Sequence, residues 1–177
     1  MGDVFKEQLV KRQGNIKDTV MKAGIIAGAL ILFMVFSILA GMNNIVNTLF
    51  PLITLGLVFG AYFLFTMLSI EYEYIYTNGE LDIDKIINKS RRKRVFSTDI
   101  RAIEIMAHID DKSYQHEFDN IKKTMDFSSG KNGKNTYVAR VAYNNETVKI
   151  IFDPNNIIQE AMMPVLTQRK FHVNPNK

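Results

Sequence analysis

Five side chains that can bind a divalent metal lie close together in this sequence. They are His108, Asp110, Asp111, His116 and Glu117. Imidazole nitrogens and carboxylate oxygens are ligands that zinc and related ions accept. Their spacing matches no helix-borne motif such as H-E-x-x-H, which places two imidazoles on one helical face. We therefore interpret the segment as a solvated loop and predict no metal site, while a metal-dependent enzyme using His108 and His116 stays open as a third hypothesis.

Other reactive groups are scarce. The chain contains no cysteine, which excludes thiol catalysis, disulfide bonds and thiolate metal sites. Ser128-Ser129-Gly130-Lys131 shares its Gly-Lys step with phosphate-binding loops, but it lacks their first glycine and their GK[ST] ending. We therefore expect no catalytic residue, no cofactor and no enzymatic activity.

The densest group of charges is basic and consists of Arg91, Arg92, Lys93 and Arg94. Near a membrane such a cluster can contact anionic headgroups, or it can contact a protein partner. Alternation along a strand would direct only about half of the four toward a bilayer. The other interpretation is a salt-bridged strand, because Glu80, Asp82 and Asp84 belong to a neighbouring predicted strand. We expect no nucleic-acid binding, since residues 71–177 carry 17 basic and 15 acidic side chains.

A long apolar stretch precedes all of these residues in the chain. Residues 23–70 contain no Asp, Glu, Lys, Arg or His over 48 positions, and one crossing of a bilayer needs about 20 helical residues. Three asparagines interrupt the stretch at residues 43–47. The pattern predicts a transmembrane hairpin with spans at 23–40 and 49–70, an external loop at 41–48, Thr48 as a helix N-cap and Pro51 in the first turn.

Basic residues flank this hairpin on both sides and are absent between the spans. The positive-inside rule then predicts a multi-pass protein of the cell membrane with both termini in the cytoplasm. No ionisable group lies within the spans, so we predict an anchor rather than an ion or proton pathway.

Each span carries one small-xxx-small pair, which allows close packing of membrane helices. The pairs are Gly24 with Gly28, and Gly56 with Gly60. Counted from the predicted span ends, they lie at different depths. One pair could therefore serve the hairpin and the other a second subunit, as in a homo-oligomer.

Residues 1–22 precede the hairpin. Phe5, Leu9, Ile16 and Val20 follow spacings of four and seven, which predicts an amphipathic cytoplasmic leader helix. Such a helix could lie in the headgroup layer or against the cytoplasmic domain. Gly14 weakens it and allows a break there.

Residues 71–177 show the period-two pattern of β-strands. Asn78-Gly79 predicts a type I′ turn that places Tyr76 opposite Leu81, and Tyr74 opposite Ile83. Asn144-Asn145 joins a second hairpin over residues 136–152, and residues 94–96 and 101–107 are further strands around a turn at 97–99. Asp153 and Pro154 predict the start of a C-terminal helix. The fold class is α+β: a transmembrane hairpin followed by a small antiparallel barrel or sandwich closed by a helix.

Three segments carry a resemblance to a known family: residues 74–83, 91–95 and 99–104. With the order of its elements, the chain resembles an uncharacterised family of small two-span membrane proteins of Gram-positive bacteria with a cytoplasmic PH-like domain. The resemblance implies an architecture and no activity. Phosphoinositide-binding members of the wider superfamily have a longer, basic first loop. The tight Asn78-Gly79 turn here is too short for that pocket, so we do not expect inositol-lipid binding.

These observations lead to two main functional hypotheses. In the first, the hairpin anchors a non-enzymatic interaction module in the lipid bilayer, and its domain binds an unidentified protein partner through a sheet edge or beside the C-terminal helix. In the second, the chain is an accessory subunit that packs on a larger membrane complex through its transmembrane helices.

Overall fold

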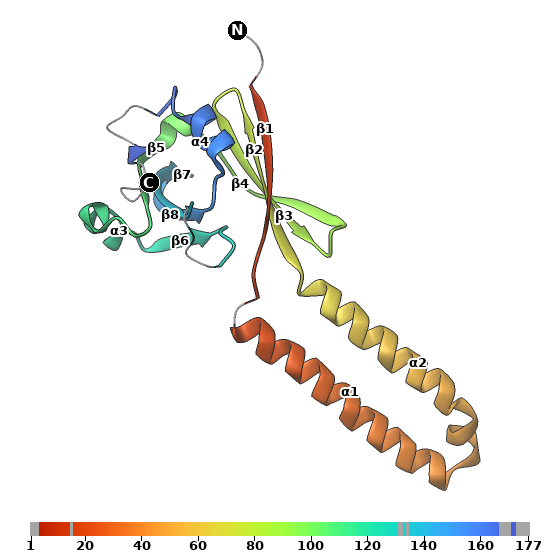
Figure 1. Ribbon diagram of the computed structural model, residues 1–177. Coiled ribbons are helices and arrows are strands. Elements are labelled where there is room, and N and C mark those ends of the chain that lie inside the picture. Colours follow the sequence, from red (N-terminus) through yellow and green to blue (C-terminus); the bar gives the residue numbers. More distant parts are fainter. Residues whose placement is uncertain (1–3, 15, 131–132, 134, 167–170, 173–177) are drawn as a thin grey trace. The chain divides into compact units, whose positions relative to one another are not determined.

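The computed structural model describes residues 4–14, 16–130, 133, 135–166 and 171–172. The chain forms two compact units (Figure 1). One unit is a pair of helices from residues 14–69, and the other is a β-rich domain from residues 1–13 and 70–177. The helical pair is therefore an insertion within the chain of the domain. The fold class is α+β, as predicted.

Two long helices, α1 (Ile16–Met42) and α2 (Asn44–Met67), pack against each other. Their 27 and 24 residues correspond to about 40 and 36 Å at 1.5 Å per residue, more than the hydrocarbon thickness of about 30 Å. No described residue of either helix is buried by the rest of the chain. Both helices are long and apolar enough to cross a membrane. Their exposed apolar side chains need lipid or protein to cover them.

The connection between the helices is shorter than the predicted loop at 41–48. Asn43 alone separates them, and its side-chain oxygen accepts hydrogen bonds from the backbone N–H groups of Ile45 at 2.8 Å and Val46 at 3.4 Å. Asn43 rather than Thr48 is the N-cap, and Pro51 lies inside α2. The prediction was wrong because asparagines interpreted as a loop instead satisfy the free N–H groups of a helix start.

The segment before the helices is a strand, which corrects the predicted leader helix. β1 (Phe5–Lys11) pairs antiparallel with β2 (Ile70–Thr77), from Phe5 opposite Thr77 to Lys11 opposite Glu71. The helix begins only at Ile16, after Gly14. Phe5 and Leu9 share one face of a strand as well as of a helix, so their spacing did not discriminate. The partner strand, far away in sequence, decides the conformation.

The pairing of β1 with β2 constrains the membrane topology. These strands flank the two candidate spans, and backbone pairing requires them to lie in the same aqueous compartment. The chain between them must therefore cross a bilayer an even number of times. Two crossings meet this condition.

The first sheet has the strand order β1-β2-β3-β4, with β3 at Glu80–Ile87 and β4 at Arg91–Asp99. The predicted register is confirmed: Tyr76 lies opposite Leu81 and Tyr74 opposite Ile83. Asn78 and Gly79 have φ values of +50° and +99°, as a type I′ turn requires. This turn joins β2 to β3, so it is not the first loop of the domain. The first connection, between β1 and β2, contains the two long helices.

The second sheet has the order β6-β8-β7-β5-β9 and lies beside the first (Figure 1). Its strands are β5 (Ile103–His108), β6 (Lys123–Asp126), β7 (Tyr137–Tyr143), β8 (Glu146–Phe152) and β9 (Phe171–His172). The predicted register of β7 and β8 is confirmed, with Tyr137 opposite Phe152 and Ala139 opposite Ile150. Contrary to an all-antiparallel sheet, β6 pairs parallel with β8, and β9 with β5. Both parallel partners are short strands of two and four residues, which an alternation pattern does not reveal.

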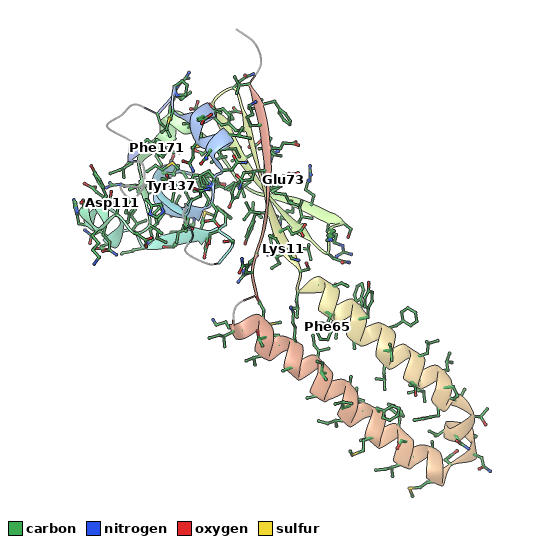
Figure 2. All side chains as sticks on the ribbon, in the orientation of Figure 1. Lys11, Phe65, Glu73, Asp111, Tyr137 and Phe171 are labelled. Carbon is green, nitrogen blue, oxygen red and sulfur yellow. The ribbon has the colours of Figure 1, made fainter. Side chains whose placement is uncertain are left out.

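The core lies between the two sheets and is rich in aromatic rings. Tyr137 and Phe171, labelled in Figure 2, pack with ring centroids 5.6 Å apart. Tyr74 has no exposed surface, and its ring meets that of Phe152 edge-on at 5.9 Å. The Tyr74 hydroxyl donates a hydrogen bond to the Phe127 carbonyl at 2.7 Å and accepts one from the Asp153 N–H at 3.1 Å. Burial raises the pKa of Tyr74 well above its usual value, so the hydroxyl stays protonated.

The C-terminal helix α4 (Asn156–Met162) starts later than predicted. Asn155 is its N-cap and accepts a hydrogen bond from the Ile158 N–H at 2.9 Å. Asp153 instead accepts from the Ser129 N–H at 2.7 Å. Both residue types cap helices well, and a competing tertiary donor for Asp153 moves the start of the helix.

Candidate functional site

Basic side chains gather at one end of the β3–β4 hairpin. Ile87 pairs with Arg91 across a connection in which Asn88 and Lys89 both have φ near +52°. Cross-strand partners share a face, so Lys85 and Lys93, which lie directly opposite each other, point to the same side of the sheet. The hairpin therefore directs Arg91 and Lys93 to one face of the sheet, and Arg92 and Arg94 to the other.

The two arginines of the other face are neutralised by carboxylates. Arg94 lies 2.9 Å from an Asp82 oxygen and 3.1 Å from an Asp84 oxygen. Arg92 lies 2.5 Å from Glu73, which is labelled on β2 in Figure 2. Asp84 is buried, and a buried carboxylate needs such partners. The salt-bridged interpretation therefore describes Arg92 and Arg94.

The remaining cations of the hairpin lack such partners. Within the part of the chain that the structure describes, no carboxylate lies within 4.0 Å of Lys85, Lys89, Arg91 or Lys93. Lys89, Arg91 and Lys93 are exposed, and Lys85 is half-buried. Opposed like charges such as Lys85 and Lys93 destabilise a strand pair, so this end of the sheet carries uncompensated positive charge.

Exposed apolar side chains also occur on β1 and at α4. Apart from α1 and α2, the large apolar side chains that are exposed among the described residues all lie on or next to these two elements: Val4, Phe5, Leu9, Ile157 and Met163. Phe5 and Leu9 are 55% and 57% exposed. The Gln8 side chain joins the two elements, because it donates to the Asp153 carbonyl at 2.8 Å and accepts from the Asn155 N–H at 2.7 Å.

β1 is also the edge of its sheet. The Arg12 N–H donates to the Ile70 carbonyl, and the Asn78 N–H donates to the Val4 carbonyl, each at 3.1 Å. Backbone groups of the even-numbered residues therefore face β2, and those of Phe5, Glu7 and Leu9 face the free edge. Such an edge can pair with another strand.

The four glycines of the helical pair line one apolar hollow of about 310 Å³ between α1 and α2. Gly28 and Gly56 lie 15 and 13 residues from Asn43, so they are at similar depths, contrary to the prediction. The error came from placing an eight-residue loop between the spans. A Cβ added at Gly24, Gly28, Gly56 or Gly60 would meet no atom within 4 Å. The glycines thus leave an open groove and are not needed for contact between α1 and α2.

Four of the five residues first considered as metal ligands divide between two hollows, and Asp110 lines neither. His116 and Glu117 line one of about 540 Å³ beside Arg140, and His108 and Asp111 line another of about 150 Å³. His108 is buried at the end of β5, edge-on to the Tyr137 ring at 5.4 Å. Across the described ranges, no three His, Asp or Glu side chains are placed to hold a metal ion. The Lys131 of the phosphate-loop comparison lies outside the described residues.

Sequence reasoning missed the role of β1 and of the hairpin end beyond residues 91–94. The sequence carried no clear signal for β1, because its run of Phe-Lys-Glu-Gln-Leu-Val-Lys does not alternate apolar with polar residues. A signal for Lys85 and Lys89 was their position next to residues 91–94 across a short turn.

Comparison with known proteins gives one match. No curated protein and no solved structure matches the chain significantly. A family model described as Bacterial PH-like domain (DUF6106) matches residues 2–172. The match runs from before β1, through both candidate spans, to β9, so the inserted helical pair lies within the family's extent. This chain belongs to the bacterial PH-like domain family DUF6106.

Proposed function

We propose that the protein is a membrane-anchored, non-enzymatic interaction module. Its two spans hold the PH-like domain at the cytoplasmic face of the cell membrane, where the domain binds a protein partner. The observation that carries this proposal is the insertion of the spans between two paired strands of one sheet. Two covalent connections leave adjacent strand ends, which restricts the domain more than a single linker would.

The non-enzymatic part of the proposal draws support from the family, because PH-like domains are typically non-enzymatic. The cytoplasmic side draws support from charge. Lys6, Lys11, Arg12, Lys17 and Lys22 precede the first apolar stretch, and the basic hairpin follows the second, while the connection around Asn43 has no basic residue. This asymmetry is typical of cytoplasmic flanks.

We infer that the partner contributes an extended segment that pairs with the free edge of β1. Backbone hydrogen bonds to Glu7 and its odd-numbered neighbours would supply affinity. Phe5 and Leu9 on one face of the strand would supply apolar contacts. Exposed apolar groups on an unpaired edge are otherwise an aggregation hazard.

Glu7→Pro tests this edge. Proline removes an N–H that faces away from β2, and edge strands tolerate it. We expect the domain to stay folded while partner capture falls by about tenfold or more, since a lost backbone hydrogen bond is worth roughly that factor. The measurement is quantitative mass spectrometry of proteins crosslinked to the full chain in mild detergent extracts.

Glu7→Gln is the matched control, because it removes the charge and keeps the N–H. It should capture the same proteins as the unmodified chain. Identical partner lists for all three chains would contradict binding at the β1 edge. Circular dichroism at increasing temperature verifies that Glu7→Pro is folded.

A second candidate function is favoured by the glycine groove. The chain could be an accessory subunit whose groove between α1 and α2 receives a helix of a larger membrane complex or of a second copy. Gly28→Ile with Gly60→Ile would fill the groove, and the open space at both positions means that the hairpin itself should persist. We expect the associated subunit to be lost on purification. Unchanged co-purification, with Leu30→Ile on the exposed surface of α1 as the control, would exclude this candidate.

A further inference from the structure

We infer that the end of the β3–β4 hairpin is a contact surface for anionic phospholipid headgroups. The surface, here called the basic tip, consists of Lys85, Lys89, Arg91 and Lys93. The inference rests on the proposed function in one respect: α1 and α2 must span the bilayer. It differs from a contact of residues 91–94 as a block, because it excludes Arg92 and Arg94 and adds two lysines.

The chain connection brings the basic tip near the membrane. Only Leu68 and Ser69 separate α2 from β2, and three Cα–Cα steps of 3.8 Å reach at most about 11 Å. Ile70 therefore lies close to the end of a candidate span at any angle between the two units. Ile70 pairs with Ile87, and Ile87 pairs with Arg91. Two strand spacings of about 4.8 Å then place the Arg91 backbone about 10 Å from that of Ile70.

The charges of the basic tip are available for a ligand. Arg92 and Arg94 already pair with Glu73, Asp82 and Asp84, so they add little net field. The four tip cations have no carboxylate within ion-pair distance among the described residues. A headgroup phosphate would neutralise the repulsion between Lys85 and Lys93. The field of an anionic leaflet acts over a Debye length of about 8–10 Å. The two steps above hold the Arg91 backbone within about 21 Å of the end of α2, so the chain connection allows the basic tip to reach this layer.

Lys89 adds an independent argument. Its φ of +52° lies in the left-handed region, where residues with a Cβ are strained and glycine is not. Asn88 beside it has a residue type that adopts this region more readily than lysine does. Lys89 therefore places a positive charge at the exposed tip although its conformation lowers the stability of the turn.

The experiment uses the full chain in lipid nanodiscs. Because the sequence has no cysteine, Ser90→Cys introduces a single thiol at the tip for a fluorescent label. Quenching by nitroxide-headgroup lipid reports contact with the headgroup layer. We expect strong quenching in discs with 30% phosphatidylglycerol, weak quenching in phosphatidylcholine alone, and loss of the difference at about 1 M salt, where the Debye length is about 3 Å.

Two double variants locate the contact. Lys89→Gln with Arg91→Gln should reduce the ratio of docked to free tip by about fivefold for each charge. Lys6→Gln with Lys122→Gln removes two other exposed cations and should leave quenching unchanged. Lys89→Gly should weaken docking while raising the thermal stability of the chain, which separates loss of contact from loss of folding.

Equal quenching in neutral and anionic discs would overturn the inference, as would equal losses in both double variants. These outcomes are distinct from failure of the proposed function. Partner capture through β1 can persist when headgroup contact is absent, and headgroup contact can persist in Glu7→Pro when capture is lost.

Discussion

Residues 70–177 without β1 are expected not to fold, whereas the same residues with β1 restored form a stable soluble domain. β1 supplies a seven-residue edge to the first sheet, the buried Val10 side chain, and the Gln8 hydrogen bonds to Asp153 and Asn155. Loss of β1 exposes one edge of β2 and leaves the β2 backbone groups that bond to β1 without their partners. The expected cost is several kcal/mol, comparable to the whole stability of a small domain, about 5–15 kcal/mol.

The restored chain replaces residues 14–69 by a short Gly-Asn linker. The Arg12 N–H and the Ile70 carbonyl are 3.1 Å apart, so a tight turn can join β1 directly to β2. We expect a cooperative thermal transition and dispersed amide resonances for this chain, and neither for residues 70–177 alone. A cooperative transition for residues 70–177 alone would show that β1 is dispensable, and an unfolded restored chain would show that the domain needs its spans.

Tyr74→Phe is expected to lower the stability of the domain by about 2–5 kcal/mol. The fully buried Tyr74 hydroxyl joins the first sheet to the backbone of Phe127 and Asp153, and phenylalanine leaves a carbonyl and an N–H without this partner. Each buried unsatisfied group costs about 1–3 kcal/mol. Chemical denaturation of the soluble chain with the Gly-Asn linker measures the change in the free energy of unfolding.

Tyr143→Phe is the matched control. The Tyr143 ring packs on Phe96 with centroids 4.9 Å apart, and its side chain is half-buried with no hydroxyl partner among the described residues. Loss of this hydroxyl should change stability by less than about 0.5 kcal/mol. Equal effects of the two substitutions would mean that the Tyr74 hydrogen bonds do not stabilise the domain.

Hairpin registers were predictable because they depend on local chemistry. Asn78-Gly79 permits the positive φ values of a two-residue turn, and the turn then pairs Tyr76 with Leu81 and Tyr74 with Ile83. Arg140 lies opposite Lys149 in the second sheet, and two acidic side chains pair with Arg140, Glu104 at 2.6 Å and Glu117 at 3.5 Å.

Predictions failed where a distant partner competed with a local pattern. A helical spacing in residues 5–20 was overruled by pairing of β1 with β2, and the helix start moved from Asp153 to Asn155 because Ser129 engages the Asp153 carboxylate. β9 was missed for the same reason, since two residues carry no periodicity and only β5 makes them a strand.

In the candidate site, too, the local pattern was predictable and the distant partners were not. The charge of residues 91–94 was evident, but neither the carboxylates that neutralise Arg92 and Arg94 nor the isolation of Lys85 and Lys93 can be assigned from spacing alone. A bulge between Ile83 and Asp84 sets which arginine meets which acid.

By itself the sequence determined that the chain has two helices able to span a membrane and an adjoining β domain with at least two hairpins. Hydrophobic length and turn chemistry are local properties, so they can be recognised without a fold. Only the tertiary structure decided that β1 completes the domain across the inserted spans, that the glycines form one groove, and which cations remain unpaired. Each of these depends on contacts between residues far apart in sequence, whose free energy exists only once both partners are in place.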